Sequence, residues 1–284
     1  MSVDVDLHLN TTFSDGTFTP AESVQKAVYR GLKTIAITDH DTTDGLAVSR
    51  ENADLYGVNL IPGIEIGTKL NTDEIHILGY YVEENDVEFQ RVLKAHRDDR
   101  LTRGERIIRI LNELGYNVSW ERVLQIASGG SVGRPHIAHA LVEQGYAKDV
   151  KTAFEKLIGP EGPAYVERWL MTPEEAIRLL VQNGAVPVLA HPFNSPFKAG
   201  RKGISNLEEI IPILISHGLA GIEVHYGDYG DAQVDKLLKL AELHNIVATG
   251  GSDYHGVGGK GEPQMGQRGP ESSVVADLEN LRRK

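Results

Sequence analysis

The chain has 284 residues, of which 40% are hydrophobic and 24% are charged, as in ordinary folded globular proteins. Its 29 basic and 40 acidic residues give a formal net charge of −11, which argues against a surface that coats nucleic acid, because phosphate contacts need clustered Lys and Arg. The sequence contains no Cys, so disulfides and thiolate ligands are excluded, and any transition-metal site must be built from imidazole and carboxylate groups.

Membrane insertion and export are not expected. No apolar run approaches the roughly 18 to 20 residues that a membrane-spanning helix needs. The N-terminal segment MSVDVDLHLN lacks the basic and apolar regions of a signal peptide. We therefore expect a cytoplasmic protein with no membrane partner.

The first part of the chain alternates short β-branched runs with helical patterns. The fourth β run follows the third after a short polar turn, which predicts a hairpin. In chain order, strands are predicted at 3–8, 33–40, 58–68 and 74–82, and helices at 20–30 and 44–56. This spacing is typical of repeated β–α units.

The middle of the chain, residues 88–183, contains no convincing strand. Helical patterns here end at Gly115, Gly145 and Gly184, and Gly is the residue that most often follows the end of a helix. We interpret residues 100–167 as a helical insertion (cap) domain within a barrel formed by residues 1–99 and 168–284.

The helix predicted at 172–185 belongs to the returning barrel. Thr172 is its expected N-cap, with Pro173 at the first helical position and Glu175 completing a capping box. Three later strands are predicted at 186–192, 219–226 and 245–255. Seven strands alternating with helices indicate an α/β fold of the small-barrel type, and a short closing element is expected after the Gly-rich segment.

Imidazole and carboxylate groups gather at the predicted strand ends. In parallel barrels the carboxyl ends of the strands converge on one rim, where active sites are assembled. These residues are His8, Asp15, His40, Glu65, His76, His191, Asp253 and His255. Such a set without Cys suits zinc, manganese or iron.

Residue spacing supports this convergence. Residues two apart on a strand share a face, so His8 and Asn10 point the same way, as do Asp253 and His255. Glu65 and His76 lie on either side of the polar turn from Lys69 to Asp73, so a hairpin would set them opposite each other.

Each of these residues also has an ordinary structural interpretation. A single His in a strand is more often a hydrogen-bonded structural residue than a ligand. Asp15, within SDG, is typical of a turn, and Glu65 alone would be satisfied by a Lys. Five histidines together with three carboxylates nevertheless favour a metal site.

Five motifs together resemble the PHP superfamily, named for polymerase and histidinol phosphatase. They are DLHLNTTFSDGTFTP, LKTIAITDHDTTDGL, IPGIEIGT, VLAHP and GGSDYHG, and they cover nearly the whole chain. The segment SVGRPHIAHALVEQGYAKD resembles the branch that includes bacterial 3',5'-nucleoside bisphosphate phosphatases and a 5'-to-3' exoribonuclease. The resemblance implies a distorted seven-stranded (β/α)7 barrel, the PHP fold, with a helical insertion.

The resemblance also implies two or three divalent ions, manganese foremost and iron or zinc as alternatives. It assigns one ion to His8, Asn10, Glu65 and Asp253, a second to Glu65, His76 and His191, and a third to Asp15, His40 and His255. Among these ligands we expect Glu65, His191, Asp253 and His255 to be catalytic.

Asn10 departs from the family pattern, which usually has His at this position. An amide oxygen is a weaker ligand than imidazole for such cations. The ion at His8 is therefore weakly bound, exchangeable or absent, or Asn10 is an engineered substitution. The sequence leaves these alternatives open.

Arginines of the insertion are candidate substrate ligands. Arg100 and Arg103 share one helix face, and Arg134 and His136 lie at the start of another helix, where anions bind readily. A solvated surface is the equal alternative for Arg100 and Arg103, whereas for Arg134 we favour binding of a second phosphate.

The remaining histidines are given other roles. His139 is expected to be structural, and the role of His225 stays open. His96, His217 and His244 follow helical surface patterns and are not expected to be ligands.

We expect a metal-dependent phosphoesterase that uses metal-activated water and needs no Ser or Cys nucleophile. Its substrates would be 3',5'-nucleoside bisphosphates or short 5'-phosphorylated oligoribonucleotides, and duplex DNA is not an expected partner. A histidinol-phosphate-type phosphomonoesterase is the alternative enzyme. A non-catalytic metal-binding module is the third hypothesis, motivated by Asn10. The oligomeric state is not predicted.

Overall fold

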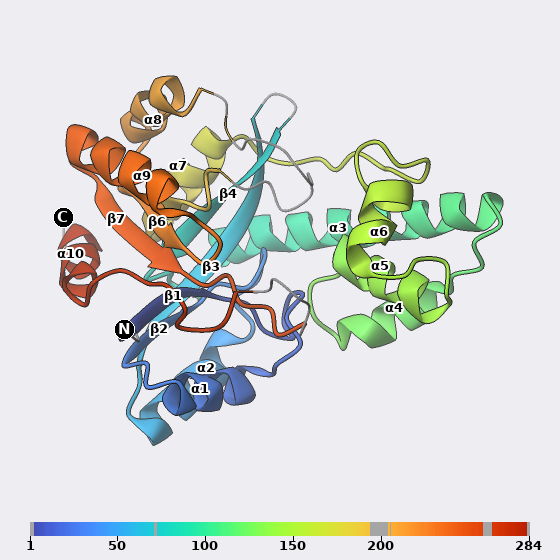
Figure 1. Ribbon diagram of the computed structural model, residues 1–284, viewed down its shortest axis with the longest axis horizontal. Coiled ribbons are helices and arrows are strands. Elements are labelled where there is room, and N and C mark those ends of the chain that lie inside the picture. Colours follow the sequence, from blue (N-terminus) through green and yellow to red (C-terminus); the bar gives the residue numbers. More distant parts are fainter. Residues whose placement is uncertain (1–2, 71–72, 194–203, 205, 258–262, 283–284) are drawn as a thin grey trace.

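A seven-stranded sheet forms the centre of the computed structural model, which describes residues 3–70, 73–193, 204, 206–257 and 263–282 (Figure 1). The strands neighbour one another in chain order. They are β1 (Val5–Leu9), β2 (Thr34–Ile37), β3 (Asn59–Leu70), β4 (Asp73–Tyr80), β5 (Val186–Leu189), β6 (Gly221–Tyr226) and β7 (Val247–Gly251). A parallel bridge between Leu9 and Tyr254 brings the last strand back to the first, so the predicted seven-stranded barrel is confirmed.

The strand β4 runs against both of its neighbours, whereas the other pairs are parallel. Its reversed direction places His76, near the start of β4, beside the end of β3. Glu65 pairs with Leu78 and His76 pairs with Gly67, so the prediction that Glu65 faces His76 directly is wrong by two residues. An offset of two keeps both side chains on one face as diagonal neighbours, because the side-chain period is two.

Six helices pack around the barrel: α1 (Pro20–Tyr29), α2 (Leu46–Tyr56), α7 (Pro173–Asn183), α8 (Leu207–Ser216), α9 (Asp231–His244) and α10 (Ser273–Arg282). The expected capping box at α7 is present, since the Thr172 hydroxyl accepts from the Glu175 amide and the Glu175 carboxylate accepts from the Thr172 amide. Gly184 ends the helix in a left-handed conformation. The predicted closing element is α10.

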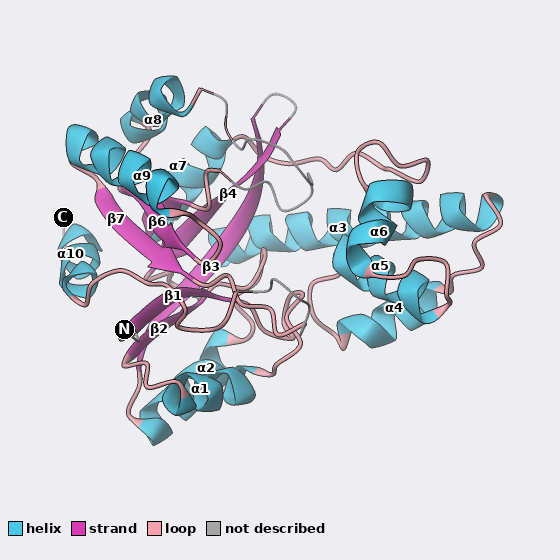
Figure 2. Ribbon diagram, in the orientation of Figure 1, coloured by secondary structure: helices cyan, strands magenta, loops and turns pink. Residues whose placement is uncertain are grey.

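The long helix α3 (Val87–Glu113) leaves the barrel and carries the insertion (Figures 1 and 2). Against it lie α4 (Trp120–Ala127), α5 (Arg134–Glu143), α6 (Val150–Ala153) and the π-helical turn η1 (Phe154–Ile158). Phe89 and Leu93 of α3 belong to the barrel core, whereas Ile107 and Leu111 belong to a second apolar core in the insertion. The helix therefore crosses the predicted boundary at residue 100 without a break, and the division into domains stays a prediction.

The helices that the structure describes include none that is both long and apolar enough to cross a bilayer.

Candidate metal centre and anion pocket

Eight imidazole and carboxylate side chains gather at one rim of the barrel. Most come from the end of a strand or from the loop that follows it, but Glu65 lies in the middle of β3, and the reversed strand β4 brings His76 to the same rim. Five of them, His8, His40, Glu65, His76 and His191, are at most 7% exposed. The structure thus brings the predicted ligands together.

Glu65 is the centre of this cluster. Its Oε1 lies 2.7 Å from Nδ1 of His76 and 2.8 Å from Nε2 of His191. Its Oε2 lies 3.2 Å from Nε2 of His8 and 3.2 Å from Nδ1 of His40. One carboxylate therefore faces four imidazoles, an arrangement suited to a ligand shared between two ions.

Among the described residues, three groups of side chains have ligand atoms close enough to hold an ion. Asp15, His40 and His255 form one group, the same set that the resemblance implied. The other two groups are His8 with Glu65 and His191, and His40 with Glu65 and His76. They divide the residues differently from the resemblance, so the assignment of ligands to individual ions stays a prediction.

Unpartnered ligand atoms show that this cluster fits divalent cations. Among the residues that the structure describes, His8 Nε2, Asp15 Oδ1, His40 Nδ1 and Glu65 Oε2 are buried and have no hydrogen-bond partner. Each lies 3.2 or 3.3 Å from a facing ligand atom. Cations with bonds of about 2.0–2.2 Å hold neighbouring ligands at about this separation.

The charges of the cluster also suit a cation. Burial raises the pKa of Glu65, but His40, His76 and His8 lower it more, so its pKa lies well below the usual range. Burial lowers the pKa of His76, whereas Glu65 raises it, and the result is a pKa of about 10. A cation bound at Glu65 would displace the proton that His76 otherwise holds.

A buried carboxylate behind the ligands was not predicted. Glu223 of β6 is fully buried, and its Oε1 lies 3.0 Å from Nδ1 of His8. Its Oε2 accepts a 2.8 Å hydrogen bond from the backbone amide of His191. Such a partner orients an imidazole ligand. The signal in the sequence was an acidic residue inside the apolar run GIEVHY, since a buried charge needs a partner.

Asn10 lies in the same cluster and is 1% exposed. Its Nδ2 donates to Oδ1 of Asp253 at 3.1 Å, and its Oδ1 accepts from the Ser14 hydroxyl at 3.3 Å. Tyr226 donates to the other oxygen of Asp253 at 2.9 Å. Both ends of the Asn10 amide are thus engaged, and its role as a ligand stays a prediction.

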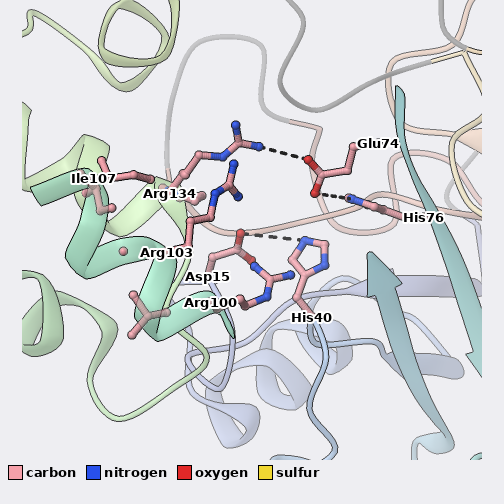
Figure 3. Close-up of a pocket in the computed structure, with 13 residues that line it drawn as sticks. Asp15, His40, Glu74, His76, Arg100, Arg103, Ile107 and Arg134 are labelled. Carbon is pink, nitrogen blue, oxygen red and sulfur yellow. Dashed lines mark hydrogen bonds and ion pairs between the residues drawn. The ribbon is translucent and has the colours of Figure 1, made fainter. Parts of the chain in front are cut away.

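One pocket joins this cluster to the insertion (Figure 3). Asp15, His40 and His76 line its barrel side, and apolar side chains of the insertion form part of its wall. Three arginines line the opposite side: Arg100, Arg103 and Arg134. An anion in this pocket would therefore touch both the metal cluster and the arginines.

The predicted arginines are anchored in the protein and are not solvated surface. Arg100 Nε donates to Asp41 Oδ2 at 2.7 Å, and Arg103 Nε donates to the carbonyl of Val166 at 2.7 Å. Arg134 Nη2 pairs with Glu74 Oε2 at 3.2 Å. Burial, followed by the charge of Arg134, lowers the pKa of Arg103 to about 9. Arg100 and Arg134 are each paired with a carboxylate, whereas Arg103 is held by a neutral backbone carbonyl.

Two histidines differ in their surroundings from the sequence interpretation. His136 is buried and accepts from the Gly133 amide at 2.9 Å, but it does not line the pocket, so its substrate role stays a prediction. The prediction that His96 lies on the surface is wrong, since it is 1% exposed. Its face of α3 is covered because Asp41 and the ring of Trp169 pack against it.

A family model described as PHP domain matches residues 6–164. The 5'-3' exoribonuclease Rnm of Salmonella typhimurium is 35% identical over 89% of this chain and 86% of its own. The 3',5'-nucleoside bisphosphate phosphatase of Chromobacterium violaceum is 30% identical over 90% and 88%. The phosphoribosyl 1,2-cyclic phosphate 1,2-diphosphodiesterase of Eggerthella lenta is 31% identical over 93% and 98%.

A solved structure gives the same result. The crystal structure of a Bifidobacterium adolescentis protein assigned as a metal-dependent phosphoesterase matches with a TM-score of 0.91 at 30% identity. The match covers 99% of this chain and 97% of that protein. The similarity therefore includes both the barrel and the helical insertion.

Proposed function

This chain belongs to the PHP domain family, and from that premise we propose that it hydrolyses phosphate esters of nucleotides that carry a second phosphate group. The predicted barrel fold and metal-dependent phosphoesterase activity are confirmed by the family match, the relatives and the solved structure. The proposed substrates are 3',5'-nucleoside bisphosphates, such as adenosine 3',5'-bisphosphate, and short 5'-phosphorylated oligoribonucleotides.

A single observation carries the proposal: the same pocket is lined by metal-cluster residues and by three arginines. The arginine fork matches phosphate oxygens in shape and charge. We propose that Arg100, Arg103 and Arg134 bind the phosphate that does not react. The reacting phosphate would then lie beside Asp15, His40 and His76.

The proposed ligand set holds two or three ions, manganese first and iron or zinc as alternatives. It comprises His8, Asp15, His40, Glu65, His76, His191, Asp253 and His255, with Asn10 at its edge. Divalent cations held there would supply the Lewis acidity that stabilises charge on the reacting phosphoryl group. Glu65, His191, Asp253 and His255 are the proposed catalytic members. The acidic, Cys-free composition supports a cytoplasmic protein that does not take duplex DNA.

The two alternative functions leave part of this pocket unexplained. A histidinol-phosphate-type substrate has one phosphate, so the three arginines would have no second anion to bind. A non-catalytic module accounts for Asn10 but leaves the convergence of the other ligands without a purpose.

A substrate panel tests the proposal. Protein loaded with Mn²⁺ should release phosphate from adenosine 3',5'-bisphosphate and mononucleotides from a 5'-phosphorylated ribotrinucleotide. Histidinol phosphate, adenosine 3'-monophosphate and the same RNA with a 5'-hydroxyl should be poor substrates. Inactivity towards every ester, with bound metal verified by elemental analysis, would refute catalysis.

A matched pair of variants tests the arginine wall, the side of the pocket formed by Arg100, Arg103 and Arg134. Arg134→Ala should lower kcat/KM for the bisphosphate by roughly a hundredfold, because a buried charge-assisted contact to phosphate is lost. Arg122→Ala is the control, since Arg122 pairs with Glu143 on the exposed face of the insertion. Equal activity of the two variants would contradict the proposed phosphate site.

A further inference from the structure

A buried carboxylate, Asp41, lies behind the pocket and directly follows the proposed ligand His40. Asp41 is 0% exposed. Its amide donates to the carbonyl of Glu65 at 3.0 Å, and its left-handed φ of 55° turns the chain away from the line of β2. The backbone of Asp41 is therefore fixed to the strand that carries Glu65.

The side chain of Asp41 joins three distant segments. Its Oδ2 accepts from Arg100 Nε at 2.7 Å and from Arg168 Nη2 at 2.8 Å. Its Oδ1 accepts from the Gly67 amide at 3.3 Å, and its carbonyl accepts from Arg97 at 3.0 Å. Helix α3 and the segment that returns from the insertion are thus tied to the rim through one residue.

This contact determines how Arg100 enters the pocket. A guanidinium is planar, so holding Nε from behind fixes the plane in which the two terminal nitrogens lie. Arg100 lines the pocket, and its Nη1 lies 3.6 Å from the position that a Cβ on Gly133, another pocket residue, would take. Within the described part of the chain, Asp41 is the one hydrogen-bond partner of the Arg100 side chain.

The contact between the Asp41 carboxylate and the Arg100 guanidinium is an ion pair at 2.7 Å, so it is a charge-assisted hydrogen bond, the stronger kind. Arg168 also pairs with Asp41 but does not line the pocket, so its contact holds the fold and not the substrate.

We propose that Asp41 is a positioning residue that aims the Arg100 guanidinium at the non-reacting phosphate and so sets the preference for substrates with a second phosphate. The inference rests on the proposed function. It assigns the preference to a residue that does not itself touch the nucleotide.

Binding to metal-free protein tests this without catalysis. Dissociation constants for adenosine 3',5'-bisphosphate and adenosine 3'-monophosphate would be measured by calorimetry in chelator. Wild type should bind the bisphosphate more tightly, and Asp41→Asn should weaken that binding roughly tenfold while leaving the monophosphate unchanged. In an Arg100→Met background the same substitution should add no further loss, because Asp41 acts through Arg100.

The outcomes separate the two proposals. If wild type prefers the bisphosphate and Asp41→Asn keeps that preference, the role of Asp41 is overturned and the proposed function stands. If wild type shows no preference, both fail. If Asp41 has a merely structural role, Asp41→Asn should weaken binding of the bisphosphate and of the monophosphate equally, and that result also overturns the inference.

A second variant covers the case in which Asp41→Asn does not fold. Arg100→Lys keeps the positive charge but removes the planar fork that Asp41 orients. It should lose the preference for the bisphosphate as Asp41→Asn does. Wild-type preference in Arg100→Lys would show that orientation by Asp41 is not needed.

Discussion

The rim of metal ligands and the arginine wall face the same pocket but are built in different ways. Most rim ligands stand at a strand end or in the loop after it, so the sheet itself sets their places. Arg100 and Arg103 reach the pocket from a helix held by Asp41 and Val166, which lie 59 and 63 residues away in sequence. The ligands thus depend on the barrel, whereas the substrate contacts depend on how the insertion packs against it.

The largest expected effect comes from breaking the rim at its centre. Glu65→Gln removes the charge that faces four imidazoles, so both metal binding and catalysis should fail. Activity should fall by at least about a thousandfold. The metal content of the purified variant, measured with its kcat, checks this.

The matched control for this variant is Glu105→Gln, because Glu105 lies exposed on α3. It should keep both metal and activity. If Glu65→Gln retains metal and rate, the rim cannot be the metal centre.

A smaller effect, on metal affinity, is expected from Glu223, which lies behind the rim ligand His8. Glu223→Gln keeps the shape of the side chain but weakens its hold on the His8 ring, which lies 3.0 Å away. Loss of such a partner typically lowers metal affinity 10- to 100-fold. Titration against a competing chelator measures the affinity. The preference for a second phosphate should not change, and a shift in that preference would contradict the separation of rim and wall.

Asn10→His tests the one member of the cluster that departs from the family pattern. An imidazole is the stronger ligand, so metal affinity should rise by roughly tenfold. The hydrogen bond from Asn10 to Asp253 would be replaced, and the arginine wall would be untouched. Metal retained per chain after dialysis against graded chelator gives the readout. Unchanged retention and rate would mean that position 10 does not limit the site.

The same contrast explains what could be predicted from the sequence. His8, His40 and His191 were predictable because strand ends converge whatever the details of packing. The pairing of His76 with Gly67 was not, since the register depends on where a short turn closes. A two-residue difference there changes which side chains stand directly opposite.

On the insertion side, local pattern was a poor guide to burial. The run DDRLTRGER is rich in charge and has the appearance of a solvated helix face. Arg103 is nevertheless 9% exposed and His96 1% exposed, because the returning segment and Asp41 cover that face. Contacts between segments so far apart leave no periodic trace in the sequence.

The smallest expected effect is on stability, and it tests whether the barrel and the insertion unfold together. Thr172 and Ser119 are exposed N-caps, one on the barrel helix α7 and one on the insertion helix α4. Each hydroxyl accepts from the backbone amide three residues ahead, so replacement by Ala should cost about 1 kcal/mol in either place. Because α3 contributes apolar side chains to both cores, we expect one cooperative transition that both variants lower equally. Calorimetry that resolves two transitions, each moved by only one variant, would instead make the insertion an independently folding unit, joined to the rim through contacts such as Arg100 with Asp41 and Arg134 with Glu74.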